Sequence, residues 1–206
     1  LFRSQISSEL IRRIPFNRKI KGFFIRASML LKDYHFNYEF RCSRINIRWS
    51  ASGFPDLLTR HMMFEGMYQE DVLVALRHFV QKGDIVFDIG SHHGLMTVIA
   101  AIASGSTGKV VAFEPNPFVR TYTQKHIALN SLPNVIIEDI ALSSRKGETS
   151  FFIQSGMVTW NSTIVEKFAS QADTQITVPT TTLDNYVFPE FHVKIKSPSI
   201  TSNWRG

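Results

Sequence analysis

The chain has 206 residues, of which 44% are hydrophobic and 19% charged, so it can form one globular domain with a sizeable core and an appendage. The single cysteine, Cys42, excludes an internal disulfide framework and a cysteine-rich metal site, and it fits a reducing compartment. No apolar run approaches the roughly 20 residues of a membrane span, and the N-terminal segment shows no apolar secretory block with a cleavage site. We therefore expect a cytoplasmic protein.

The net charge of +6 is concentrated near the N-terminus. Residues 1–50 hold eleven Lys and Arg against three acids, so the rest of the chain is slightly negative. A basic segment can contact anionic lipid or nucleic acid, but here the arginines are scattered among Phe, Ile and Leu, as on the solvated face of a helix. We read residues 1–54 as a basic N-terminal extension that can touch anionic surfaces, and we expect no nucleic-acid partner.

The first regular pattern is the alternation of apolar and polar side chains over residues 38–49, which predicts a half-exposed strand or hairpin. Residues 56–81 have a helical pattern in two pieces, separated by Gly66. The second piece carries one predicted apolar face, formed by Val72, Leu73, Leu76, Phe79 and Val80.

The next stretch has the order strand, glycine turn, helix and strand. Residues 85–87 form a short apolar run typical of a parallel strand buried on both faces. Gly90 and Gly94 bracket a tight turn, where the backbone can come close to a ligand. An apolar helix follows and stops at Ser104-Gly105, and residues 110–113 make a second buried strand.

An acid, Glu114, ends this second strand. A carboxylate one strand away from a glycine turn can accept two ribose hydroxyls, so these parts suit a nucleoside cofactor. Asn116 is a good N-cap and Pro117 a good first residue for a helix that runs to about Asn130. A third strand is expected over residues 135–140.

This β-α-β-α-β order predicts an α/β fold with a doubly wound, Rossmann-like parallel sheet. Ligands of such sheets bind beyond the carboxyl ends of the strands, and Asp88, Glu114 and Asp139 all lie at or near such ends. The C-terminal part is predicted to contain strands at residues 149–154 and 175–178, a short helix at 163–169, a helical turn at 182–186, a fourth core strand at 191–196 and an unstructured tail at 197–206.

Five motifs occur together in the order and spacing of one family: Phe87-Asp-Ile-Gly-Ser-His-His-Gly, Phe113-Glu-Pro-Asn-Pro, Ala141-Leu-Ser with Lys146-Gly-Glu, Thr181-Thr-Leu-Asp and His192-Val-Lys-Ile. Over residues 55–196 the chain thus resembles the FkbM-type S-adenosylmethionine-dependent methyltransferases. The resemblance implies the class I methyltransferase fold, S-adenosyl-L-methionine as cofactor, and O-methylation of a hydroxyl on a sugar or small natural product.

The resemblance also has a departure. The family's fourth strand continues Lys-Ile-Asp-x-Glu-Gly, whereas here Lys194-Ile195 is followed by Lys196-Ser-Pro-Ser. We therefore expect a C-terminally truncated chain whose sheet is incomplete after the fourth core strand. A degenerate, non-catalytic cofactor-binding or scaffold protein is the alternative from another class.

The resemblance places Asp88, Gly90, Ser91 and Gly94 in the cofactor loop and Glu114 on the cofactor ribose. Asp88 either takes the amino group of the donor's methionine part or organises the turn. Asp139 and Ile140 either meet the adenine or belong to an ordinary loop.

No catalytic residue is identified from the sequence. His92 and His93 are weak candidates for a general base, because the pKa of histidine lies near working pH. Adjacent histidines with no nearby acid or cysteine do not make a metal site, so none is expected. Trp160, Asn161 and Ser162 either reach the acceptor, a small molecule or glycan, or begin a helix.

The cofactor class depends on one position in the glycine turn. The dinucleotide fingerprint is Gly-x-Gly-x-x-Gly, and Ser91 stands at its middle glycine. The side chain hinders close approach of a pyrophosphate, which S-adenosylmethionine lacks. The turn therefore favours the methyl donor, and an NAD-dependent oxidoreductase is the weaker alternative.

Overall fold

The computed structural model describes residues 35–42, 45–52, 70–153, 162, 164 and 174–191. The elements follow in the order β1 (His35–Cys42), β2 (Ile45–Ser52), α4 (Glu70–Phe79), β3 (Ile85–Ile89), α5 (Leu95–Ser104), β4 (Lys109–Phe113), α6 (Pro117–Leu129), β5 (Val135–Glu138), β6 (Ala141–Leu142), β7 (Gly147–Ile153), β8 (Thr174–Thr181) and α7 (Leu183–Phe191).

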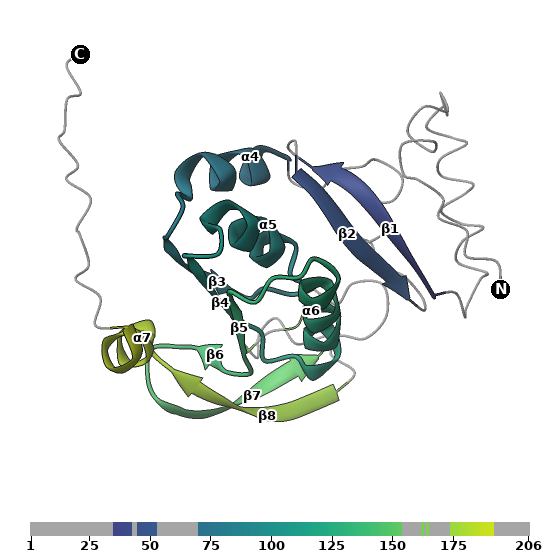
Figure 1. The fold of residues 1–206 in the computed structure, drawn as a ribbon. Coiled ribbons are helices and arrows are strands. Elements are labelled where there is room, and N and C mark those ends of the chain that lie inside the picture. Colours follow the sequence, from purple (N-terminus) through teal and green to yellow (C-terminus); the bar gives the residue numbers. More distant parts are fainter. Residues whose placement is uncertain are drawn as a thin grey trace, which may run out of the picture.

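A parallel sheet with strand order β3-β4-β5 lies at the centre of the molecule (Figure 1). Helix α5 connects β3 to β4, and α6 connects β4 to β5. Helix α5 packs against both β3 and β4, and it also contacts α4 and α6. The predicted α/β fold with a Rossmann-like parallel sheet is therefore confirmed.

The two predicted buried strands differ in their surroundings. From Val110 to Phe113, β4 is at most 1% exposed, as expected for a strand covered on both faces. The prediction is wrong at Ile85, the first residue of the predicted run, which is 40% exposed, and Ile89 at the other end of β3 is 58% exposed. The reason is the sheet order, because within the described part of the chain β3 pairs with β4 alone.

Strands β1 and β2 form the predicted hairpin, an antiparallel pair in which Tyr38 faces Trp49. Two side chains of β2, Ile47 and Trp49, are fully buried. They belong to the same core cluster as Leu73 of α4 and three residues of α5, namely Leu95, Val98 and Ile99. Strand β2 also packs against α6 (Figure 1), so the hairpin shares the core of the parallel sheet.

The predicted apolar face of α4 is only partly buried. Leu73 is fully buried and Leu76 packs against the same cluster, whereas Val72 is 43% and Phe79 75% exposed. Residues three or four apart share one helix face, so Leu73 and Leu76 point to the core together. Val72 and Phe79 are seven apart and lie on a neighbouring face.

A second sheet has the strand order β6-β8-β7, with β6 parallel and β7 antiparallel to β8. It confirms the strands predicted at residues 149–154 and 175–178. Its core consists of Ala141, Phe151, Ile153 and Val178. In Figure 1 this sheet lies below the carboxyl end of the parallel sheet.

Helix α7 is longer than the helical turn predicted at residues 182–186. The Thr182 hydroxyl accepts a hydrogen bond from the backbone N–H of Asn185 at 3.0 Å and so caps the helix. Because α7 ends at Phe191, the predicted fourth strand is wrong at its first residue. Its remainder at 192–196, the tail and the first helical piece lie outside the described residues. So does the predicted helix at 163–169, except for Ile164, which is assigned as a bend.

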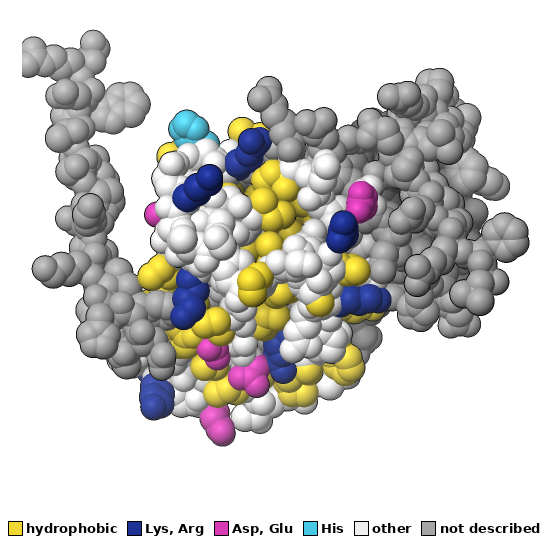
Figure 2. Space-filling model, viewed as in Figure 1, with side chains coloured by type: hydrophobic (Ala, Val, Ile, Leu, Met, Phe, Trp, Pro, Cys, Tyr) yellow, Lys and Arg dark blue, Asp and Glu magenta, His cyan; other side chains and the backbone are white. Residues whose placement is uncertain are grey.

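On the face drawn in Figure 2, hydrophobic side chains form a band through the middle, and Lys and Arg are spread around it without gathering into one patch. The lysines and arginines before residue 35 lie outside the described part. Among the helices that the structure describes, none combines the length and the apolar character needed to cross a membrane.

Candidate functional site

The segment between β3 and α5, residues 90–94, is called the glycine loop here. Gly90 and Gly94 have φ values of 76° and 80°, in the left-handed region that favours glycine. The backbone N–H groups of Gly90 and Ser91 both donate to the carbonyl of Phe113, at 2.9 and 3.1 Å. The glycine loop is thus tied to the end of the neighbouring strand β4.

Gly94 is required for a second reason, which is the close approach of α6. A Cβ atom at this position would lie 2.6 Å from Cγ2 of Thr123, well inside van der Waals contact. The backbone of the glycine loop therefore packs directly against the side chain of Thr123 on α6, which leaves no room for the Cβ atom of an alanine.

Glu114 follows β4 and is 5% exposed. Its Oε2 accepts the backbone N–H of His92 at 2.7 Å, and its Oε1 accepts the backbone N–H of Asn116 at 2.9 Å. Burial raises the pKa of Glu114, although these two hydrogen bonds and the nearby Arg120 oppose the shift. The carboxylate thus faces the glycine loop, as the sequence predicted.

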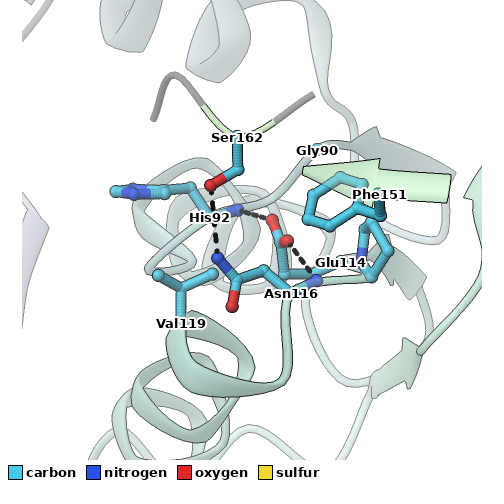
Figure 3. Close-up of a pocket in the computed structure, with 8 residues that line it drawn as sticks. Gly90, His92, Glu114, Asn116, Val119, Phe151 and Ser162 are labelled. Carbon is cyan, nitrogen blue, oxygen red and sulfur yellow. Dashed lines mark hydrogen bonds between the residues drawn. The ribbon is translucent and has the colours of Figure 1, made fainter. Parts of the chain in front are cut away.

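A cavity of about 180 Å³ opens beside this carboxylate (Figure 3). The glycine loop, the start of α6 and the second sheet all contribute to its wall, through Gly90, His92, Glu114, Pro115, Asn116, Val119, Phe151 and Ser162. Polar groups of Glu114, Asn116 and Ser162 meet apolar groups of Val119 and Phe151 there. Such a mixed wall suits a ligand with one polar and one apolar part.

The structure brings Gly90, His92, Glu114 and Ser162 together around this cavity. Ser91 follows Gly90 and is buried, and Gly94 is the N-cap of α5. Trp160 and Asn161 lie outside the described residues.

Asp88 does not line the cavity. Its Oδ2 accepts a hydrogen bond from the hydroxyl of Thr97 on α5, which links the end of β3 to the helix. Burial raises the pKa of Asp88, and the bonds from Thr97 oppose this shift. Of the two roles considered from the sequence, these contacts favour the organisation of the turn.

Asp139 and Ile140 are not among the residues that line this cavity. Strand β5 ends at Glu138, whose carbonyl accepts the backbone N–H of Glu114 at 2.9 Å. The chain then turns into β6, and Asp139 is exposed, with Oδ2 4.0 Å from Nη2 of Arg120. Neither residue belongs to the wall described here, and their contact with the adenine stays a prediction.

The two histidines of the glycine loop have different surroundings. His92 lines the cavity, and its ring stacks on that of His93 with 4.2 Å between centroids. His93 is buried, and this burial, with a smaller effect of His126, lowers its pKa to about 3. Only His92 is therefore placed to meet a ligand. Among the described residues, no three His, Cys, Asp or Glu side chains gather as for a metal ion.

Sequence reasoning missed four residues of the wall, namely Pro115, Asn116, Val119 and Phe151. Asn116 is the predicted N-cap, since its Oδ1 accepts the N–H of Phe118 at 3.0 Å, but it also lines the cavity. Val119 lies one turn further along α6, so its position follows from that cap. Phe151 comes from β7, and nothing in the sequence indicates which strand covers the cavity.

Comparison with known proteins gives one family match. The family model described as Methyltransferase FkbM domain matches residues 88–200, which is more than half of the chain. An uncharacterized protein of Methanocaldococcus jannaschii is 35% identical over 63 residues, which are 31% of this chain and 23% of that protein. The chain therefore spans about a quarter of the curated relative that it matches.

Solved structures with partial overlap include a SAM-dependent O-methyltransferase from Thermotoga maritima, 17% identical with a TM-score of 0.35, over 63% of this chain and 60% of that one. They also include P. horikoshii TYW2 in complex with MeSAdo, 14% identical with a TM-score of 0.38, over 63% and 55% of the two chains.

Proposed function

This chain belongs to the FkbM methyltransferase domain family, whose methyl donor is S-adenosylmethionine, and we propose that the cavity beside Glu114 holds the adenosine part of that donor. The observation that carries the proposal is the position of the Glu114 carboxylate, which lies in the cavity wall and is bonded to the glycine loop. An acid after the second strand, facing the loop after the first, is the arrangement that a nucleoside requires.

The chemistry of the cavity fits this group. A carboxylate has about four acceptor positions, so Glu114 can accept ribose hydroxyls while it keeps its bonds to the N–H groups of His92 and Asn116. Phe151 and Val119 offer apolar surface for a purine. A volume of about 180 Å³ is below the roughly 300–1,000 Å³ of whole-ligand pockets, so the cavity accommodates part of the donor.

The proposed reaction is methylation of a hydroxyl on a sugar or small natural product, the acceptor class that the family resemblance implies. The donor's sulfonium supplies the electrophilic methyl group when it is bound. The chain's own task is to bind and orient the two reactants and to keep water away. Of the residues around the cavity, His92 has the imidazole that can take the hydroxyl proton.

The proposal is tested by comparing three ligands on the wild-type chain: S-adenosylmethionine, its demethylated product S-adenosylhomocysteine, and NAD. A ligand at 100 times its Kd should raise the free energy of unfolding by about 2.7 kcal/mol, which a thermal shift detects and calorimetry quantifies. We expect stabilisation by the first two ligands only. Stabilisation by NAD would support the oxidoreductase instead, and no effect of any ligand would support a degenerate protein.

A further inference from the structure

Two neighbouring carbonyl groups of the glycine loop are held by one helix. The hydroxyl of Thr123 donates to the carbonyl of His92, and Nδ1 of His126 lies 2.8 Å from the carbonyl of His93. Thr123 and His126 are three residues apart on α6, so they share a face, and both are 0% exposed.

The ring of His126 is fixed from its other side by the hairpin β1–β2. It stacks on Trp49 with 3.5 Å between ring centroids and 16° between planes, and its Nε2 lies 3.3 Å from the carbonyl of Ser50. Burial lowers the pKa of His126 to about 4, so the ring is neutral at pH 7 and donates through one nitrogen. Because the contact of Nδ1 is the shorter of the two, we assign the proton to Nδ1, which donates it to the carbonyl of His93.

The loop needs such support because its backbone is strained at His92. This residue has a φ of 51°, and a left-handed conformation costs a non-glycine residue about 1–2 kcal/mol. Strained conformations persist only where the surroundings over-determine them. Here the N–H of His92 is held by Glu114, its carbonyl by Thr123, and the next carbonyl by His126.

We propose that His126 is a positioning residue for the glycine loop. Held in its plane by Trp49, it fixes the carbonyl of His93 and thereby the backbone that presents His92 and its N–H to the cavity. The expected effect of His126 on ligand affinity rests on the proposed function. Its expected effect on the backbone of the glycine loop does not. The hairpin is then part of the cofactor-binding unit and not merely a neighbour of it.

Two substitutions separate the contacts of His126. In His126→Asn the side-chain amide nitrogen can take the place of Nδ1 and keep the bond to the carbonyl of His93. In His126→Gln the longer side chain places its amide nitrogen where Nε2 was, so the bond to the loop is lost. The matched control is Asn130→Ala, because Asn130 joins α6 to the hairpin through both backbone groups of Arg48, at 2.8 and 2.7 Å, without touching the loop.

The first readout is amide hydrogen exchange of the ligand-free chain at His92 and Gly94, whose N–H groups bond to Glu114 and Ser91. The second is the Kd of S-adenosylhomocysteine, measured well below the Tm of every variant. We expect His126→Gln to speed exchange at both amides and to weaken binding about three- to tenfold, the effect of one hydrogen bond. His126→Asn should stay within about twofold of wild type, and Asn130→Ala should lower the Tm only.

Unchanged loop exchange in His126→Gln would overturn the proposal. So would equal effects of His126→Gln and Asn130→Ala on the loop, since these would indicate a general loss of stability. If His126→Gln speeds loop exchange while the wild type fails to bind S-adenosylhomocysteine, the positioning role stands and the proposed function falls.

Discussion

The carboxylate of Glu114 accepts the backbone N–H of His92 at 2.7 Å, although the two residues are 22 positions apart and follow different strands. This bond joins the end of β4 to the glycine loop. It also places both residues in the wall of one cavity. Glu114 therefore shapes the loop, and in the proposed function its remaining acceptor positions hold the ligand.

The first prediction concerns Gly94, whose φ is 80° and whose missing Cβ would lie 2.6 Å from Cγ2 of Thr123. Gly94→Ala should lower the free energy of unfolding by about 2–4 kcal/mol, because strain and overpacking add. Denaturant unfolding measures this loss.

Gly90→Ala is the matched control, since Gly90 has a similar φ of 76° but no atom within 4 Å of its Cβ position. It should lose only about 1–2 kcal/mol. Thr123→Ser removes Cγ2, so it should recover part of the loss in a Gly94→Ala background. Equal losses at the two glycines would contradict the close packing of the loop on α6.

The second prediction concerns the pH dependence of stability. Because burial raises the pKa of Asp88, the folded chain holds this proton more tightly than the unfolded chain. The resulting stabilisation is complete below the ordinary pKa of 3.8 and is lost as the pH rises through the folded pKa. Asp88→Asn keeps an oxygen for the hydroxyl of Thr97 and removes the titration.

Between about pH 4 and pH 7, the free energy of unfolding of Asp88→Asn should therefore fall less than that of the wild type. Thr97→Val should make the fall steeper, because the bond from Thr97 lowers the pKa of Asp88. Identical pH profiles for all three proteins, measured by chemical denaturation, would show that the pKa of Asp88 is not raised in the folded chain.

The sequence was sufficient for features that depend on local order. The apolar run of β4 followed by an acid predicted both the strand and the place of Glu114, and Asn116-Pro117 predicted the start of α6. Gly90 and Gly94 predicted the turn because few other residues adopt its backbone conformation.

Features that depend on tertiary neighbours could not be predicted in this way. The exposure of Ile85 and Ile89 follows from the position of β3 in the sheet, and this position cannot be inferred from a local sequence pattern. Phe151 reaches the cavity because the second sheet packs there. In the sequence, nothing distinguishes His126 from an ordinary polar residue of a helix.

The third prediction concerns Phe151, which lines the cavity and belongs to the core of the second sheet. Phe151→Leu keeps an apolar side chain and should cost less than about 1.5 kcal/mol of stability. It should weaken S-adenosylhomocysteine about two- to tenfold, because an aromatic contact contributes about 0.5–1.5 kcal/mol. Calorimetric titration gives the Kd.

Phe152→Leu is the control for this prediction, because neighbouring residues of a strand point to opposite faces of the sheet. It should leave the Kd unchanged. An equal loss of affinity in both variants, or none in Phe151→Leu, would remove Phe151 from the ligand site.

The most direct test of the account is a calorimetric titration of S-adenosylhomocysteine into the wild type, Glu114→Ala and Glu148→Ala, the last of which removes an exposed acid. Hydrogen bonds to a charged group contribute about 1.5–3 kcal/mol, so Glu114→Ala should raise the Kd by about one to two orders of magnitude. Glu148→Ala should bind as the wild type does. An unchanged Kd in Glu114→Ala would contradict the assignment of the cavity to the donor's adenosine.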